Sequence, residues 1–308
     1  MPVYSPSATR TYAECPRKRY LQKKGLTPKY AAKAAVSRWM GTAMAAGLEQ
    51  HNRMRAFATP SIITPYRAAA VRWEEQVLQF LDAGGVVTDE TFETRIPPLM
   101  QRALEHYVAH DVVPAEWEIV GVEQTFERAG NARPDLIVID ADGYAPVDYK
   151  MKESLYVKPG ETRDAARSRV MAELGREYDW NQKHYMWSIR RFIGQPCTHH
   201  YLVLGELSPK PVFTIQRYDI TESAMQSWID DAHQWWANMY ETEIDHINLP
   251  RMSPTHDSKY GACEFQYACL DAEGDESGTN TSTSRLKGVR SEIRCKKCST
   301  EESIYSCG

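Results

Sequence analysis

The stretch PDLIVIDADGYAPVDYK, residues 134–150, has the pattern of two short strands joined by a turn. It nevertheless places Asp135, Asp148 and Lys150 where alternation predicts apolar side chains. Because successive side chains of a strand point to opposite faces, the three charges fall on one face of the hairpin. A shared charged face of this kind is a candidate functional site.

Two positions of the turn are possible in this hairpin. Asp142-Gly143 is a strong two-residue turn signal, and it pairs Lys150 with Asp135. A turn at Ala141-Asp142 pairs Asp148 with Asp135 instead. In either register the two carboxylates lie about 4.5–8 Å apart, which is close enough to share a divalent ion.

The alternative to a metal site is a solvated hairpin. In that case Asp135 and Lys150 form an ordinary cross-strand ion pair on a wet face. Two carboxylates in a half-buried sheet repel each other, however, unless Lys150 or a bound cation compensates their charge. A metal ion is the simplest compensation.

Further motifs occur in the order found in a known nuclease family. Pro134-Asp135 followed by Asp148-Tyr149-Lys150 resembles the PD-(D/E)xK signature, in which an acid before a hydrophobic strand precedes an Asp-x-Lys tripeptide. The chain also resembles the RecB-like branch of that superfamily, which includes CRISPR-associated exonucleases. This likeness rests on Glu123 in the preceding strand, Gln182-Lys-His-Tyr185 downstream and the opening box Tyr12–Tyr20, YAECPRKRY. Together the motifs span about residues 11–270.

The resemblance implies an α/β (α+β) chain with a restriction-endonuclease-like core, in which a small mixed sheet is flanked by helices. The pattern of residues agrees, with β-rich segments from Trp117 onward and helical stretches near 6–24, 31–50, 67–83, 98–110, 164–194 and 221–245. One nuclease domain is expected over residues 1–270. Its parts are a helical region over about 1–115, a catalytic core over about 116–250 and a Cys-containing closing segment over about 251–270. Residues 271–292 lack apolar periodicity and are expected to be a flexible linker, followed by a Cys-containing tail at 293–308.

By the same resemblance, Asp135, Asp148 and the backbone carbonyl of Tyr149 hold Mg²⁺ or Mn²⁺, which prefer hard oxygen ligands. Lys150 orients or deprotonates the attacking water and offsets the charge of the phosphate. Gln182 helps to position Lys150 or the DNA backbone. Tyr185 packs in the core or contacts a phosphate, and Glu123 adds a third acid to the site.

One position departs from the family pattern. Many relatives have a helical Gly-x-x-x-His whose imidazole joins the metal site, but Gly41 is followed here by Ala45. Either carboxylates and water bind the ion without an imidazole, or the activity is weakened. Glu49 lies one helical turn after Ala45 and is a nearby acid.

The chain has seven cysteines and no hydrophobic signal core at its N-terminus, so clustered cysteines are interpreted as metal ligands rather than disulfides. Cys15, Cys263 and Cys269, with His256, resemble the iron–sulfur staple of RecB-like and CRISPR-associated nucleases. Such a Cys₃His set suits either a [4Fe-4S] cluster or a tetrahedral zinc ion. The alternative is a pair of buried thiols with a surface histidine. Cys295, Cys298 and Cys307 form a half-site without a clear fourth ligand.

The net charge of -4 conceals an asymmetry along the chain. Residues 1–60 contain eleven Lys and Arg but only two acids, so their net charge is about +9. A basic N-terminal face can steer a polyanion, and Arg17, Lys18 and Arg19 are the predicted DNA contacts. A solvated charged surface is an equally good explanation of the charge count alone.

Together these observations predict a divalent-metal-dependent DNA nuclease that hydrolyses phosphodiester bonds at DNA ends or in single strands. Its context would be recombination, repair or phage DNA metabolism. No P-loop motif occurs, which indicates a stand-alone enzyme or one that works with a helicase or recombination protein. Two alternatives stay open: a catalytically weakened or inactive nucleic-acid-binding protein of the same fold, and a CRISPR adaptation nuclease. No apolar run is long enough to span a membrane, so a cytoplasmic protein is expected.

Overall fold

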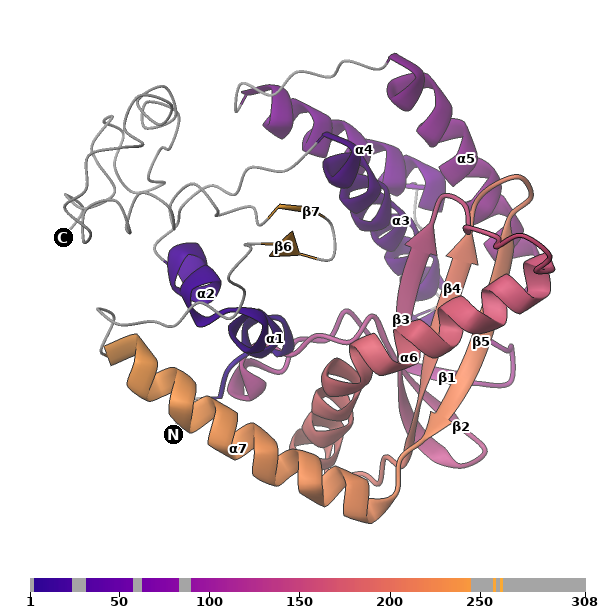
Figure 1. Cartoon of the computed structure of the whole chain (residues 1–308). Helices are drawn as coiled ribbons and strands as arrows, with labels where there is room; N and C mark the ends of the chain where they lie inside the picture. Colours follow the sequence, from indigo (N-terminus) through magenta and orange to yellow (C-terminus); the bar gives the residue numbers. More distant parts are fainter. Residues whose placement is uncertain are drawn as a thin grey trace, which may run out of the picture. The chain divides into compact units, whose positions relative to one another are not determined.

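The computed structural model describes residues 3–23, 32–57, 63–82, 90–244, 257–258 and 261–262. The chain divides into two compact units, one formed by residues 32–232 and the other by residues 1–31 and 233–308 (Figure 1). The domain boundaries expected near residues 270 and 292 lie outside the described residues.

The unit of residues 32–232 is built on a five-stranded sheet. Its strands are β1 (Glu118–Val122), β2 (Leu136–Asp140), β3 (Gly143–Lys152), β4 (His199–Glu206) and β5 (Val212–Asp219), and they lie side by side in that order. All neighbours are antiparallel except β3 and β4, which are parallel and are joined by helix α6 (Arg163–Ser188). A parallel pair requires such a crossover. The prediction of a small mixed sheet flanked by helices is therefore confirmed.

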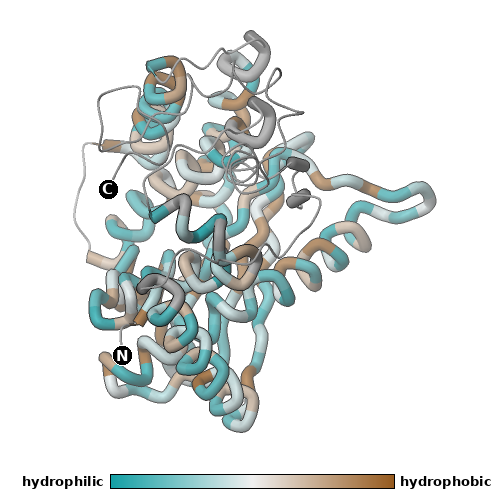
Figure 2. Tube along the Cα trace, turned by 60° about the vertical axis from the view of Figure 1, so that its left-hand side comes forward, coloured by the Kyte–Doolittle hydropathy of each residue, from teal (hydrophilic) through white to brown (hydrophobic). Residues whose placement is uncertain are grey.

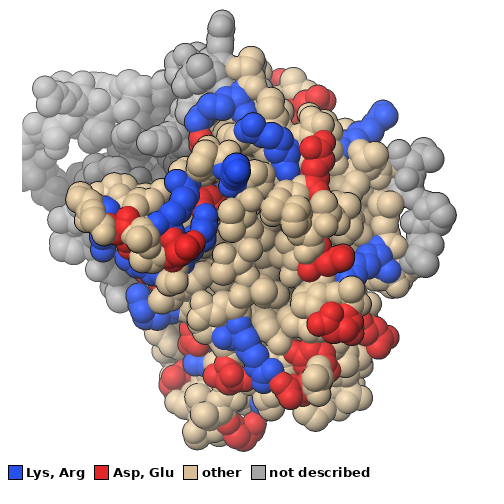
Figure 3. Space-filling model, turned by 90° about the vertical axis from the view of Figure 1, so that its right-hand side faces the viewer, with Lys and Arg blue, Asp and Glu red and all other residues tan. Residues whose placement is uncertain are grey.

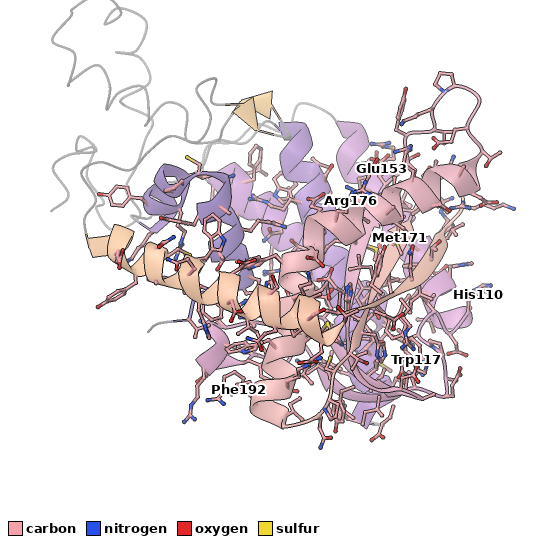
Figure 4. All side chains as sticks on the ribbon, turned by 60° about the horizontal axis from the view of Figure 1, so that its bottom comes forward. His110, Trp117, Glu153, Met171, Arg176 and Phe192 are labelled. Atoms are coloured by element: carbon pink, nitrogen blue, oxygen red, sulfur yellow. The ribbon has the colours of Figure 1, made fainter. Side chains whose placement is uncertain are left out.

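Helices cover both faces of this sheet. On one face lie α3 (Ala32–Phe57), α4 (Pro65–Asp82) and α5 (Glu90–Ala109). The buried side chains that these helices share with the sheet include Trp39, Met44, Leu104, Val138, Val147 and Tyr149. On the other face α6 packs through Met171 and Leu174 against Leu202 and Leu204 of β4. Met171 is labelled on α6 in Figure 4. Because Val147 and Tyr149 face the helices α3–α5, alternation turns Asp148 and Lys150 toward α6.

The pattern of apolar residues explains why these segments are helical. Brown and teal alternate along the helices in Figure 2, as expected where one face is buried and the other is in water. Thr162 caps α6 by accepting a hydrogen bond from the Ala165 N–H at 3.2 Å. The helix predicted at 164–194 ends at Ser188, and the next residues form a π-helix, η2 (Ile189–Ile193), which closes at Gly194 with a left-handed φ of 76°. A short 3₁₀ turn, η1 (Glu127–Ala129), lies between β1 and β2.

A buried carboxylate fixes the start of α6 to the sheet. Glu206, at the end of β4, is 1% exposed and forms ion pairs with Arg163 and Arg167 of α6. It also accepts the Leu155 N–H at 3.1 Å, from the loop between β3 and α6. Strand, loop and helix are thus joined at one acid.

The second unit contains the two chain ends. Its described elements are α1 (Pro6–Glu14), α2 (Pro16–Lys23), the C-terminal part of α7 (Glu222–Ile244), β6 (Asp257–Ser258) and β7 (Gly261–Ala262). The single helix expected from residue 6 to 24 is wrong, because the chain is extended at Cys15, with φ -165° and ψ 111°. Pro16 disfavours the helical conformation of the residue before it, so the helix restarts there. In this unit Tyr12 packs edge-to-face on Trp235, and the Trp236 Nε1–H donates to Thr9 Oγ1 at 3.3 Å. Among the described helices, we find none with the length and apolar character needed to cross a bilayer.

Asp140 secures the end of β2 where the hairpin turns. Its carboxylate accepts hydrogen bonds from the Tyr201 hydroxyl, from His199 Nε2 at 2.7 Å and from the Asp142 N–H at 2.8 Å. Burial alone would raise the pKa of Asp140, but the hydrogen bonds from Tyr201, the Asp142 N–H and His199 outweigh burial and lower the pKa below its usual value. The hairpin is therefore tied to β4 through this side chain.

We expect Asp140→Ala to lower the free energy of unfolding by about 3 kcal/mol, because it leaves buried donors of Tyr201 and His199 without their charged acceptor. Chemical denaturation at neutral pH measures the change. Asp142→Ala is the matched control, since its ion pair with Arg217 is well exposed and its removal should cost about 1 kcal/mol or less. Equal losses in the two variants would contradict the role given to Asp140.

Candidate active site

The register of the β2–β3 hairpin sets the positions of the charged residues. The strands pair from Leu136 with Val147 to Asp140 with Gly143, so the turn is Ala141-Asp142. The turn predicted at Asp142-Gly143 is therefore wrong, and the second of the two open registers holds. Gly143 instead begins β3 with a positive φ of 115°, a conformation that favours glycine, while Asp140 accepts the Asp142 N–H.

This register places Asp135 opposite Asp148, one step beyond the last paired residues. The Tyr149 N–H donates a hydrogen bond of 2.6 Å to Asp135 Oδ2, which fixes that carboxylate against the neighbouring strand. The side chain of Asp148 is only 6% exposed. Burial, with Asp148 and Glu123 nearby, raises the pKa of Asp135 above its usual value despite the opposing charge of Lys150. The site therefore concentrates negative charge where water is scarce.

Lys150 compensates part of this charge. Its ammonium forms an ion pair with Asp148 Oδ2 and lies 4.1 Å from the centre of the Tyr178 ring of α6. Burial alone would lower the pKa of Lys150, but Asp148 and Asp135 outweigh it and raise the pKa above its usual value. Lys150 is thus a protonated cation at neutral pH.

Glu123 is brought to the same site by an irregular end of β1. The pairing of β1 with β2 shifts between Ile119 and Gly121, a bulge of the kind that redirects a side chain. Glu123 itself has a left-handed φ of 50°, and its N–H donates to the Asp135 carbonyl at 3.0 Å. Its carboxylate is paired with Arg133 at 2.7 Å. Burial raises the pKa of Glu123, and the negative charges of Glu49 and Asp148 raise it further.

Helix α6 contacts the site through Tyr178, and Gln182 and Tyr185 follow on the same helix. Tyr178, Gln182 and Tyr185 are spaced by four and three residues, so they lie on one face of α6, the face that Tyr178 presents to Lys150. Gln182 is 0% exposed, and neither of its amide atoms has a hydrogen-bond partner among the described residues. A buried amide without hydrogen-bond partners destabilises the folded protein. The Gln182 amide is therefore available to bind a water molecule or a ligand. Tyr185 is 8% exposed, as expected for the packing role.

The back of the same strand carries residues that sequence reasoning missed. The Tyr149 hydroxyl lies 2.6 Å from that of Tyr107 in α5 and accepts a hydrogen bond of 3.3 Å from Asn52 Nδ2 of α3. The Asn52 and Tyr107 positions are 97 and 42 residues from Tyr149. No local sequence signal marks them, because the contact exists only after the helices dock on the sheet.

The helix that departs from the family pattern also lies near the site. Ala45 is half-buried on α3, and Glu49, one turn later, is paired with Arg53 at 2.9 Å. Glu49 contributes to the raised pKa of Glu123, so its charge acts on the site. The expectation that Glu49 lies in this region agrees with that interaction.

The donor set fits a hard divalent cation. Asp135, Asp148 and the Tyr149 carbonyl offer oxygen atoms at one place, and the crowded carboxylates need a counter-charge. Within the part of the chain that the structure describes, no three side chains of His, Cys, Asp or Glu converge in a metal-binding arrangement. Mg²⁺ commonly keeps several waters and takes only one or two carboxylates, so a two-carboxylate set is sufficient.

The other predicted sites lie in the unit of the chain ends. Cys15 is a half-buried free thiol, and its Sγ accepts the Lys18 N–H at 3.5 Å. Its predicted partners His256, Cys263 and Cys269 lie outside the described residues, as do Cys295, Cys298 and Cys307.

The predicted DNA contacts also belong to the unit of the chain ends. Arg17, Lys18 and Arg19 are part of α2, where Lys18 and Arg19 are half-buried. Figure 3 shows a different face, on the side of α6 and β5, where basic and acidic side chains are intermixed.

Two comparisons with known proteins complete the description of the site. A search of curated proteins found no match. The family model of the PD-(D/E)XK nuclease superfamily matches residues 3–270, which include every residue of the hairpin, Glu123, Gln182 and Tyr185. The match covers most of the chain and agrees with the mixed sheet and the acid-acid-lysine hairpin, and the chain therefore belongs to the PD-(D/E)XK nuclease superfamily.

Proposed function

We propose that this chain is a divalent-metal-dependent deoxyribonuclease that cuts phosphodiester bonds at DNA ends or in single strands. The observation that carries the proposal is the arrangement of Asp135, Asp148 and Lys150 on one face of the hairpin, fixed by the Tyr149 N–H. Membership of the nuclease superfamily supports the reaction type. An exonuclease acting in recombination, repair or phage DNA metabolism, alone or with a helicase, is the biological context that we infer.

The residues have distinct tasks in this reaction. Asp135, Asp148 and the Tyr149 carbonyl would hold Mg²⁺ or Mn²⁺, which when bound polarises the phosphate and lowers the pKa of a coordinated water. Lys150 is a protonated cation, so it orients the attacking water and offsets the growing charge on the phosphate. The NH₂ group of Gln182 can donate to the water or to a phosphate oxygen, and its carbonyl oxygen can accept from the water.

The hydrolysis is balanced by simple proton movements. The oxygen of water attacks phosphorus and releases one proton to the solvent, the phosphorus–oxygen ester bond breaks, and the leaving oxygen takes up one proton from the solvent. The raised pKa of Lys150 favours a role in orienting water and stabilising charge over a role as the base. Asp148, which holds the ammonium through an ion pair, sets the position of Lys150.

We expect Lys150→Ala to reduce cleavage of end-labelled single- and double-stranded DNA in Mg²⁺ or Mn²⁺ by roughly 100-fold or more. Lys152→Ala is the matched control, since Lys152 is an exposed lysine two residues later on the same strand. EDTA should abolish cleavage by the wild type and by the control variant. If the wild type and Lys150→Ala cleave equally, or neither cleaves while both bind DNA, the enzyme proposal fails and the nucleic-acid-binding alternative remains.

Asp135 should make the protein less stable as the pH rises. Its raised pKa in the folded state means that the folded protein holds this proton more tightly than the unfolded chain. The favourable contribution is therefore complete at acidic pH and is lost as the pH rises from the ordinary carboxyl pKa through the raised one. We expect Asp135→Asn in EDTA to raise the melting temperature at pH 8 by about 3 °C or more, with a smaller gain at pH 5.

Adding Mg²⁺ at pH 8 should raise the melting temperature of the wild type more than that of Asp135→Asn, because the cation binds the folded state through this carboxylate. Asn keeps the acceptor oxygen for the Tyr149 N–H, so the comparison isolates the charge. An equal response to Mg²⁺ in both proteins would exclude Asp135 as a ligand.

We also propose that Cys15, Cys263, Cys269 and His256 hold a [4Fe-4S] cluster or a zinc ion. The support is the resemblance of these residues to the iron–sulfur staple and the half-buried free thiol of Cys15. Anaerobically purified protein should contain stoichiometric iron or zinc by elemental analysis, and Cys15→Ser should lower that content by at least about half. Cys197→Ser is the control, since Cys197 is a buried thiol elsewhere in the chain. Metal-free wild-type protein would refute this proposal.

A further inference from the structure

Arg133 stands beside the candidate active site but belongs to none of the motifs. It lies two residues before Asp135, and its Nε is 2.7 Å from Glu123 Oε2. Glu123 has a carboxylate that is only 13% exposed, whereas the side chain of Arg133 is 61% exposed. Glu123 is therefore held within the site, whereas Arg133 is largely exposed to solvent.

The carboxylate of Glu123 has little freedom to leave. Its backbone has a left-handed φ of 50° and is bonded to the Asp135 carbonyl at 3.0 Å. At Gly121, where the strand pairing shifts, an added Cβ would lie 3.3 Å from Ile137 Cδ1 and 3.4 Å from Ile137 Cβ of β2, so the bulge packs closely on the neighbouring strand. Glu123 therefore stays in place, and a cation that binds it must move to the carboxylate.

The backbone around Arg133 is also fixed, whereas its side chain is exposed to solvent. Ala132 is 0% exposed, and its carbonyl accepts the Phe126 N–H at 2.8 Å. Pro134 is buried, and its ring fixes its own backbone angle. The long, exposed side chain of Arg133 thus extends from a fixed backbone, and its guanidinium suits both carboxylates and phosphates.

We propose that Arg133 is a positioning residue whose guanidinium holds Glu123 while the site lacks a divalent cation, and that it transfers to a phosphate of the nucleic acid when a cation held by Asp135 and Asp148 also attracts the Glu123 carboxylate. The proposal rests on the nuclease function proposed above. It assigns two states to one exposed arginine. In the first state Arg133 compensates the charge of Glu123, and in the second it binds the substrate backbone beside the hairpin.

The first test measures Mn²⁺ affinity by titration calorimetry without nucleic acid. Arg133→Gln should bind Mn²⁺ about two- to fivefold more tightly than the wild type, because a partly exposed ion pair no longer competes for Glu123. In the Glu123→Gln background, Arg133→Gln should have no such effect. Unchanged Mn²⁺ affinity in Arg133→Gln, or an equal gain in both backgrounds, would overturn the proposal.

The second test measures binding of a labelled oligothymidylate in Ca²⁺ over a range of salt concentrations. Loss of one phosphate contact should reduce the slope of log affinity against log salt by about 0.7 in Arg133→Gln, whereas Arg133→Lys should retain most of the slope. An unchanged slope in Arg133→Gln would refute the transfer to phosphate. Arg72→Gln is the control for both tests, because Arg72 forms a comparable exposed ion pair with Glu75 on α4.

The outcomes separate this proposal from the nuclease proposal. If the wild type cleaves no DNA, the nuclease proposal fails, but a Glu123-dependent gain in Mn²⁺ affinity with a reduced salt slope still supports the exchange. If the wild type cleaves DNA and Arg133→Gln matches it in Mn²⁺ affinity, the exchange alone fails. Circular dichroism should show unchanged folding, as expected for a side chain that is 61% exposed.

Discussion

The hydrogen bond from the Tyr149 N–H to the Asp135 carboxylate is the interaction on which the site depends. At 2.6 Å it joins two strands just beyond their last paired residues, where the ladder no longer fixes them. Because side chains alternate along a strand, this register also places Asp148 and Lys150 on the face of Asp135. A slip of one residue would turn Asp148 and Lys150 toward the apolar core beneath α3–α5 and lose the site.

The site gathers charge in a poorly hydrated place, and the surrounding structure restrains it from three directions. At one end of the hairpin, Asp140 ties β2 to His199 and Tyr201 of β4. At the back, the Tyr149 hydroxyl joins the helices α3 and α5. Beyond the other end, Glu206 joins β4 to the start of α6 through Arg163 and Arg167. These neutral or compensated contacts stabilise the strands that the crowded carboxylates destabilise.

The sequence was sufficient for the parts of this site that depend on local pattern. Alternation in DLIVID and VDYK predicted the shared face of Asp135, Asp148 and Lys150. Gln182 and Tyr185 were identified by their resemblance to a motif of the RecB-like nucleases. The turn stayed open because two dipeptides that share Asp142 compete there, and the Asp140 side chain with the backbone of Gly143 decides between them. Asn52 and Tyr107 carried no signal at all, since their role arises from docking of distant helices. The break at Cys15 follows from Pro16 and is an inference that the sequence did allow.

The three acids of the site differ in how their charge is compensated. Asp148 has an ion pair with Lys150, and Glu123 has one with Arg133. Among the described residues, Asp135 has the Tyr149 N–H but no ion pair, and burial, together with the charge of Asp148, raises its pKa. A dipole compensates a carboxylate less completely than a full charge does. Asp135 is therefore the acid whose charge is least compensated. A divalent ion that enters this face gains the most free energy at the Asp135 carboxylate. At Asp148 and Glu123 it has to compete with Lys150 and Arg133.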